Sequence, residues 1–108
     1  MTRTTFITAG ALATGILLGS LTAAHAADDA TVALYEKKCK VCHSIGGDAG
    51  KLADKGGALD GVGGKRDEAW LRAYLADPKS QIPDAKMPNL KLAPADLDAL
   101  VAYMLSLK

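Results

Sequence analysis

The chain has 108 residues, a formal net charge of +1 at pH 7, and only one Trp, three Tyr and one Phe. This balanced charge gives no sign of the basic surface that a nucleic-acid partner requires. The length suffices for one small domain, whose hydrophobic core is marginal without a disulfide, metal or cofactor to support it.

The N-terminal segment has the pattern of a secretory signal peptide. Arg3 precedes an uncharged, mostly apolar run over residues 6–23, and Ala24-His25-Ala26 has the small-x-small form of a cleavage site. We expect cleavage after Ala26, export to the periplasm, and a mature domain at residues 27–108. The alternative is a retained membrane anchor, which the glycines within the apolar run disfavour.

The first helix of the mature chain is predicted at residues 29–42. Asp28 or Asp29 can cap its N-terminus, because a short acidic side chain can accept a hydrogen bond from the first free backbone amides. Helical spacing brings four side chains near one face, which we expect to meet a cofactor and another helix: Thr31, Tyr35, Cys39 and Cys42.

At the end of this helix, residues 39–43 read Cys-Lys-Val-Cys-His, the C-x-x-C-H spacing of covalent c-type haem attachment. Cys39 and Cys42 can each form a thioether with a porphyrin vinyl group, and His43 can bind the iron. A structural zinc site needs about four Cys or His ligands, and a thioredoxin-like pair needs a βαβ pattern. A plain disulfide leaves His43 without a role. The motif therefore predicts one covalent haem c.

Residues 44–65 are rich in glycine and predict a loop without regular helix or strand. A compact domain tolerates so long a loop when a ligand supplies the missing core, so we expect the loop to wrap the haem edge. The alternative is a disordered linker, which we discount because neither flank is large enough to form a domain.

A second helix is predicted from Glu68 to Asp77, with Asp67 as its cap. Pro78 ends it, since proline lacks the backbone donor that a helix interior needs. Four side chains form its buried face: Trp70, Leu71, Tyr74 and Leu75.

Residues 78–94 contain all four prolines and predict a stiffened, extended loop. The last helix is predicted at about residues 94–107, with Pro94 at its first position. Its apolar stripe comprises Leu97, Leu100, Val101, Met104 and Leu105. No convincing strand or repeat is present, so the predicted fold is all-α.

The second axial ligand of the iron follows by elimination. His25 is removed with the signal peptide, and thioether sulfur is the usual alternative in c-type carriers. Met104 lies on the apolar stripe and reads as a core residue, whereas Met87 stands in a proline-flanked loop that limits its movement. We assign Met87 as the distal ligand. Lys86 is a weaker candidate at high pH, and Met87 as a mere cover over an open iron is the alternative.

Ligation by His43 and Met87 indicates electron transfer rather than catalysis. A soft thioether favours Fe(II) and raises the reduction potential. With both axial positions filled, the iron offers no site for a small-molecule substrate, and no acid, base or nucleophile constellation is visible in the sequence. The chain is therefore expected not to be an enzyme.

Together these features resemble a small monohaem class I cytochrome c of the bacterial periplasmic, His/Met-ligated type. The resemblance spans the mature chain, and residues 35–43, 70–87 and 97–105 carry it most strongly. It implies a class I cytochrome c fold with three main helices. A glycine-rich loop and a proline-flanked methionine loop would then wrap a covalent haem.

The resemblance also implies roles for further residues. Tyr35 matches a position on the first helix that crosses the last helix at the turn of Leu100 and Tyr103. Tyr74 matches a tyrosine that hydrogen-bonds near the ligand sulfur, with ordinary core packing as the alternative. Three residues are candidates for binding the haem propionates, although a solvated charge is the commoner fate of loop cations: Lys65, Arg66 and Trp70.

Two departures from the family pattern stand out. Family members often have Gly-Pro where this chain has Gly56-Gly57, and a backbone carbonyl there accepts a hydrogen bond from the proximal imidazole. The Gly57 carbonyl could still accept it, with less rigidity. Asp84-Ala85 replaces a common Gly-Thr pair, which puts a propionate hydrogen bond in doubt.

The function implied is that of a one-electron carrier between periplasmic or membrane redox proteins, either as a monomer or as a subunit of a redox complex. Lys79, Lys86 and Lys91, with Lys51 or Lys65, could surround the haem edge and meet an acidic partner. Scattered solvated lysines are the alternative. Two other functions stay open: a haem subunit of a larger oxidoreductase, and a ligand-binding sensor or peroxidase-like protein that would need a weak Met87 bond.

Overall fold

The computed structural model describes residues 27–108, with Gly10 and Gly15 in addition. The predicted signal peptide, cleavage site and membrane-anchor alternative otherwise concern residues outside this described part. Within it, none of the helices has both the length and the apolar character needed to cross a membrane.

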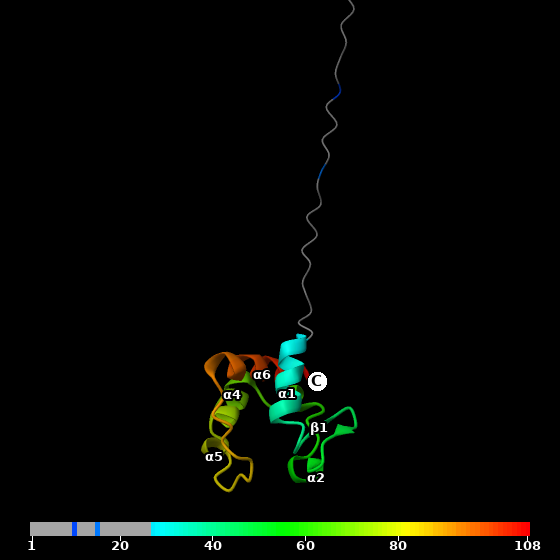
Figure 1. Cartoon of the computed structure of the whole chain (residues 1–108). Helices are drawn as coiled ribbons and strands as arrows, with labels where there is room; N and C mark the ends of the chain where they lie inside the picture. Colours follow the sequence, from blue (N-terminus) through cyan, green and yellow to red (C-terminus); the bar gives the residue numbers. More distant parts are fainter. Residues whose placement is uncertain (1–9, 11–14, 16–26) are drawn as a thin grey trace, which may run out of the picture.

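Three helices form the frame of the molecule: α1 (Asp29–Lys38), α4 (Glu68–Ala76) and α6 (Pro94–Ser106). α6 contacts both α1 and α4, and Figure 1 shows α4 on one side of the molecule and α1 on the other, with α6 reaching both. The prediction of an all-α fold with three main helices is confirmed.

α1 begins where the sequence predicts, because the Asp28 carboxylate accepts a hydrogen bond from the Thr31 amide at 2.8 Å. It ends at Lys38, so the predicted extension to residue 42 is wrong. The amides of Cys42 and His43 both donate to the carbonyl of Cys39 at 3.0 Å. The chain therefore turns sharply at the haem-attachment motif instead of continuing the helix.

The glycine-rich segment contains short regular elements, contrary to prediction. β1 (Ser44–Ile45) and β2 (Asp48–Ala49) pair antiparallel, with Ser44 opposite Ala49. The two residues between them, Gly46 and Gly47, both have positive φ angles, 59° and 82°. Such a turn matches the twist of a two-residue hairpin and strongly prefers glycine.

Two one-turn helices follow the hairpin, α2 (Ala53–Gly56) and α3 (Val62–Lys65). α3 packs on α6 through Gly63, where an added Cβ would lie 2.3 Å from the carbonyl oxygen of Leu105. The Gly63 amide also donates to the Leu107 carbonyl at 2.8 Å. This close approach explains how a segment so rich in glycine is held against the core.

α4 is capped as predicted, since the Asp67 carboxylate accepts from the Trp70 amide at 2.8 Å. Pro78 ends α4 but also begins another turn, α5 (Pro78–Gln81), where an extended loop was predicted. Proline suits the first position of a helix, because its missing N–H is not needed there. The Ser80 hydroxyl supports the junction by donating to the Asp77 carbonyl at 2.7 Å.

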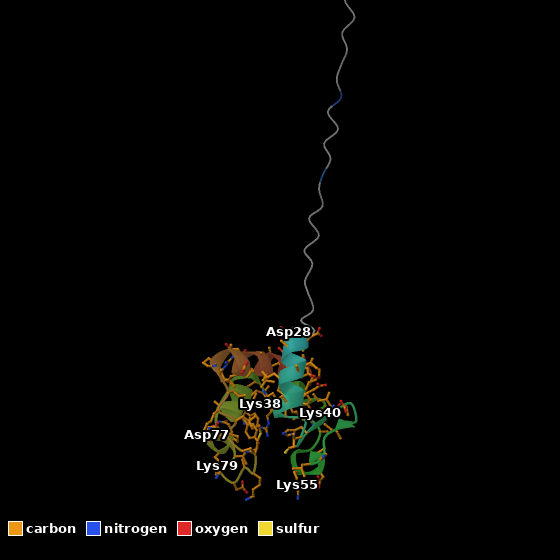
Figure 2. All side chains as sticks on the ribbon, in the orientation of Figure 1. Asp28, Lys38, Lys40, Lys55, Asp77 and Lys79 are labelled. Carbon is orange, nitrogen blue, oxygen red and sulfur yellow. The ribbon has the colours of Figure 1, made fainter. Side chains whose placement is uncertain are left out.

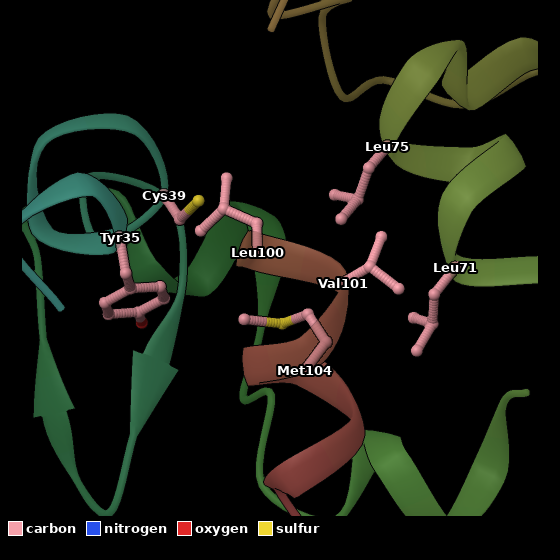
Figure 3. Packing of buried hydrophobic residues seen from close by; sticks show 7 residues of the cluster. All are labelled: Tyr35, Cys39, Leu71, Leu75, Leu100, Val101 and Met104. Atoms are coloured by element: carbon pink, nitrogen blue, oxygen red, sulfur yellow. The ribbon is translucent and has the colours of Figure 1, made fainter. Parts of the chain in front are cut away.

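The buried core lies where α1 and α4 meet α6. The rings of Tyr35 on α1 and Tyr103 on α6 pack edge to face, with centroids 5.7 Å apart, and ion pairs join Arg72 of α4 to Asp98 of α6 and to Glu68. Figure 3 shows the side chains of the buried cluster: Tyr35, Cys39, Leu71, Leu75, Leu100, Val101 and Met104.

Candidate functional site

A cavity of about 210 Å³ lies against this core. Its walls come from the C-x-x-C-H motif, α2, α3, α4, α6 and the loop after α5. Apolar side chains such as Leu59, Leu75 and Leu100 provide most of the lining. A second cavity, of about 340 Å³, shares His43, Tyr74 and Met87 with the first. The two neighbouring cavities form an apolar crevice, which we call the haem crevice.

Both cysteines of the C-x-x-C-H motif line the haem crevice, Cys39 in the inner cavity and Cys42 in the outer one. Cys39 is buried and Cys42 is half-buried, and no disulfide joins them. Burial raises the pKa of the Cys39 thiol to about 11. A thiol-redox enzyme relies on a cysteine of lowered pKa, so this environment disfavours a thioredoxin-like role. Residues 27–108 also contain no group of three or more His, Cys, Asp or Glu side chains suited to zinc.

His43 is oriented by a single backbone group. Its Nδ1 lies 3.1 Å from the carbonyl oxygen of Gly57, which confirms the acceptor predicted at this position. A carbonyl oxygen can only accept, so Nδ1 carries the proton and Nε2 keeps the lone pair. This tautomer is the one that an iron ligand needs, and the hydrogen bond fixes the orientation of the ring.

Met87 lies in the loop between α5 and α6 and is half-buried. It lines both parts of the haem crevice together with His43, although the two residues lie on different segments of the chain. Met104 is buried, as expected of a core residue, and forms part of the inner wall. The crevice thus offers an imidazole nitrogen from His43, a thioether from Met87 and the two cysteine sulfurs. This set of donors fits an iron porphyrin that is attached through cysteines.

An aromatic stack forms one wall of the inner cavity. The rings of Trp70 and Tyr74 lie nearly parallel, with centroids 4.8 Å apart, and the guanidinium carbon of Arg66 lies 4.1 Å from the centre of the Trp70 ring. All three residues line the cavity, whereas Lys65 lies outside its lining. No hydrogen bond joins the Tyr74 hydroxyl to Met87 among the residues that the structure describes.

Some residues of the crevice were not predicted from the sequence. Ile82 lines both cavities and is 36% exposed. Ile82 could have been identified by the same signal as Met87, since both are single apolar residues in a polar, proline-rich loop. Lys55 lines the outer cavity, but its helix α2 was not predicted, so the sequence offered no comparable signal.

Of the lysines expected around the crevice, Lys86 lines its outer cavity. Lys79 and Lys86 also line a neighbouring groove on the outer side of the methionine loop, together with Asp77 and Asp84. The other three lysines are exposed and lie outside the lining of these cavities: Lys51, Lys65 and Lys91.

Comparisons with known proteins agree with this geometry. The sequence model of the family described as "Cytochrome c" matches residues 29–108. Cytochrome c2 iso-2 of Magnetospirillum fulvum is 39% identical over 90 residues, an alignment that covers 64% of this chain and 91% of that protein. Cytochrome c2 iso-1 of Magnetospirillum molischianum is 37% identical over 95 residues, covering 66% and 91%. No solved structure matches the chain significantly.

The family match covers nearly the whole described domain, and the relatives are matched over almost their full length. The helical architecture and the donor set of the crevice agree with it. The chain therefore belongs to the cytochrome c family, as a small monohaem class I cytochrome c that carries one covalently attached haem c.

Proposed function

We propose that the chain, exported to the periplasm and freed of residues 1–26, carries single electrons between two redox proteins and catalyses no reaction of its own. In this proposal Cys39 and Cys42 would hold the haem through thioethers, and His43 and Met87 would bind its iron. The bound haem supplies a one-electron couple, and a thioether ligand favours its reduced state.

The observation that carries the proposal is the shared cavity of His43 and Met87. An imidazole and a thioether from different parts of the chain could both bind the iron of a haem held there, which would leave the iron no open position for a substrate or a diatomic gas. The apolar walls of the haem crevice exclude water from the centre, and exclusion of water is one of the ways in which a protein tunes reduction potential.

The aromatic wall supports more specific roles. Because Arg66 is stacked on Trp70, its guanidinium is ordered in advance, and we assign this pair to a haem propionate. Lys65, which lies outside the cavity lining, is the weaker candidate for the same group. Tyr74 packs against Trp70, so we assign it to holding this wall in place beside the ligand sulfur.

The partners are proposed to be redox proteins with an acidic docking surface. Lys55 and Lys86 line the mouth of the haem crevice, and Figure 2 shows Lys55 and Lys79 at the end of the molecule opposite Asp28. Positive charge around the mouth would steer an acidic partner toward the haem edge. Copurification with one tightly bound protein would instead identify the chain as a subunit of a larger oxidoreductase.

The proposed ligation is tested by replacing Met87 with leucine in the holoprotein. We expect Met87→Leu to lose the weak far-red absorption band of the iron–methionine bond, to lower the midpoint potential and to allow carbon monoxide to bind the reduced iron. Met104→Leu is the matched control, because it exchanges the other methionine of the cavity for a residue of similar volume. A Met87→Leu protein with unchanged spectrum and potential would contradict the ligation and, with it, the carrier function.

A further inference from the structure

The loop between α5 and α6, which carries Met87, has few hydrogen bonds of its own. Among the residues that the structure describes, no backbone amide from Lys86 to Leu90 donates a hydrogen bond. The last bond before Met87 joins the Ala85 amide to the Ile82 carbonyl at 2.9 Å. The position of Met87 therefore depends on how the chain is held on either side of this stretch.

On the N-terminal side, hydrogen bonds lead from the end of α4 through α5 to the loop. The Ser80 amide donates to the Asp77 carbonyl at 3.0 Å, and the Ile82 amide donates to the Pro78 carbonyl at 3.0 Å. Pro78 is fully buried, so packing fixes the beginning of α5. Ile82, at its end, lines both parts of the haem crevice. The turn thus connects the helical frame of the domain to the loop.

The hydroxyl of Ser80 joins α5 directly to α4. It donates to the Asp77 carbonyl at 2.7 Å and to the Ala73 carbonyl at 3.2 Å. A serine hydroxyl has a single proton, so the two carbonyl oxygens share it. Ala73 lies in the last turn of α4, and Asp77 is the residue that ends this helix. Among the described residues, no other side chain of α5 donates a hydrogen bond to α4.

We propose that Ser80 is a positioning residue for Met87, the distal ligand. Its hydroxyl fixes the direction in which α5 leaves α4, and α5 sets where the following loop enters the haem crevice. Met87 borders both the crevice and the groove on the outer side of the loop, so an outward movement of the loop has space available. The Ser80 hydroxyl opposes that movement. This inference rests on the proposed ligation by Met87.

Cyanide binding to the oxidised holoprotein, followed by stopped-flow absorption, tests the proposal. Cyanide can bind the ferric iron only after the Met87 thioether has left it, so the rate reports how readily the loop opens. We expect Ser80→Ala to bind cyanide roughly fivefold faster than the wild type, since the closed loop loses the support of one hydrogen bond. Ser80→Thr retains a hydroxyl and should restore the wild-type rate. Ser80 is exposed, so neither variant disturbs the core.

Ser106→Ala is the matched control. The Ser106 hydroxyl donates to the carbonyl of Tyr103 at 2.6 Å, which is the same kind of bond to a residue three positions earlier, but it lies at the end of α6. Both serine-to-alanine variants should lower the unfolding free energy similarly, whereas only Ser80→Ala should accelerate cyanide binding.

Equal cyanide rates in Ser80→Ala and the wild type would overturn the proposal, as would an equal acceleration in Ser106→Ala or a failure of Ser80→Thr to restore the rate. Failure of the Met87 ligation would be visible separately, because the wild-type protein would then lack the far-red band of the iron–methionine bond. That result would overturn this inference together with the proposed ligation.

Discussion

Tyr35 combines a well-packed ring with a poorly placed hydroxyl. Its ring contacts Tyr103, but the hydroxyl is buried and has no hydrogen-bond partner in the structure of residues 27–108. Burial, followed by the negative charge of a Cys39 thiolate, raises the pKa of Tyr35 from 10.0 to about 12. In the haem-bound protein the proposed thioether at Cys39 would remove the second cause and leave burial as the largest one.

The raised pKa makes the stability contribution of Tyr35 depend on pH. The folded state holds the phenol proton more tightly than the unfolded state, so the contribution is complete below the ordinary tyrosine pKa of 10.0 and is lost as the pH rises above it through the raised pKa of the folded state. We expect Tyr35→Phe to reduce this alkaline loss of unfolding free energy and to stabilise the protein by about 1 kcal/mol at neutral pH. Denaturant titrations of both holoproteins at neutral and alkaline pH measure this. A parallel alkaline decline in the two proteins would show that Tyr35 is not responsible.

The sequence identified most of the crevice at the level of single residues, because unusual residue types carry strong signals. The C-x-x-C-H motif and a lone methionine among prolines identified Cys39, His43 and Met87, all of which line the inner cavity. The conformation of Gly57 could not be predicted, since it depends on where α2 and the motif meet in space. Lys65 and Arg66 are neighbours with similar charge, and only the fold shows that Arg66 alone lines the cavity.

Among the elements, α4 depends most visibly on one cap. Asp67 satisfies the Trp70 amide, and the helix that it begins supplies Trp70, Leu71, Tyr74 and Leu75 to the cavity wall. We expect Asp67→Ala to lower the unfolding free energy of the holoprotein by about 1 kcal/mol, whereas Asp67→Asn, which retains a capping oxygen, should cost much less. Equal losses in the two variants by chemical denaturation would mean that charge, rather than capping, is what Asp67 contributes.

Helix starts were predicted more accurately than helix ends. Asp28, Asp67 and Pro94 are local signals, and each stands at the start of a helix in the structure. The early end of α1 has no local signal in the sequence. Beyond it, the Val41 carbonyl accepts a hydrogen bond at 2.8 Å from the amide of Leu52, which lies further along the chain. The short helices α2 and α3 were missed because their positions depend on distant contacts, with Gly56 lying against the motif and Gly63 against α6.

Across the whole molecule, the distribution of lysines matters more than the nearly neutral net charge. We expect Lys55→Glu combined with Lys86→Glu to slow electron transfer to an acidic redox protein about tenfold at low salt, because both residues line the crevice mouth. Lys37→Glu combined with Lys108→Glu changes the total charge equally but lies in grooves beside α1 and the end of α6. Stopped-flow rates measured across ionic strengths compare the two pairs. Equal slowing would contradict a localised docking site.

The residues that line the haem crevice are spread along the sequence, from Cys39 to Met104. Its walls therefore come together only when almost the entire chain has folded. A bound haem, which is rigid and apolar, would enlarge the small hydrophobic core that the few buried side chains form. We therefore expect the domain to fold completely only when haem is attached. A cell short of porphyrin would then lose this polypeptide to proteases, so its abundance would follow haem supply as well as gene expression.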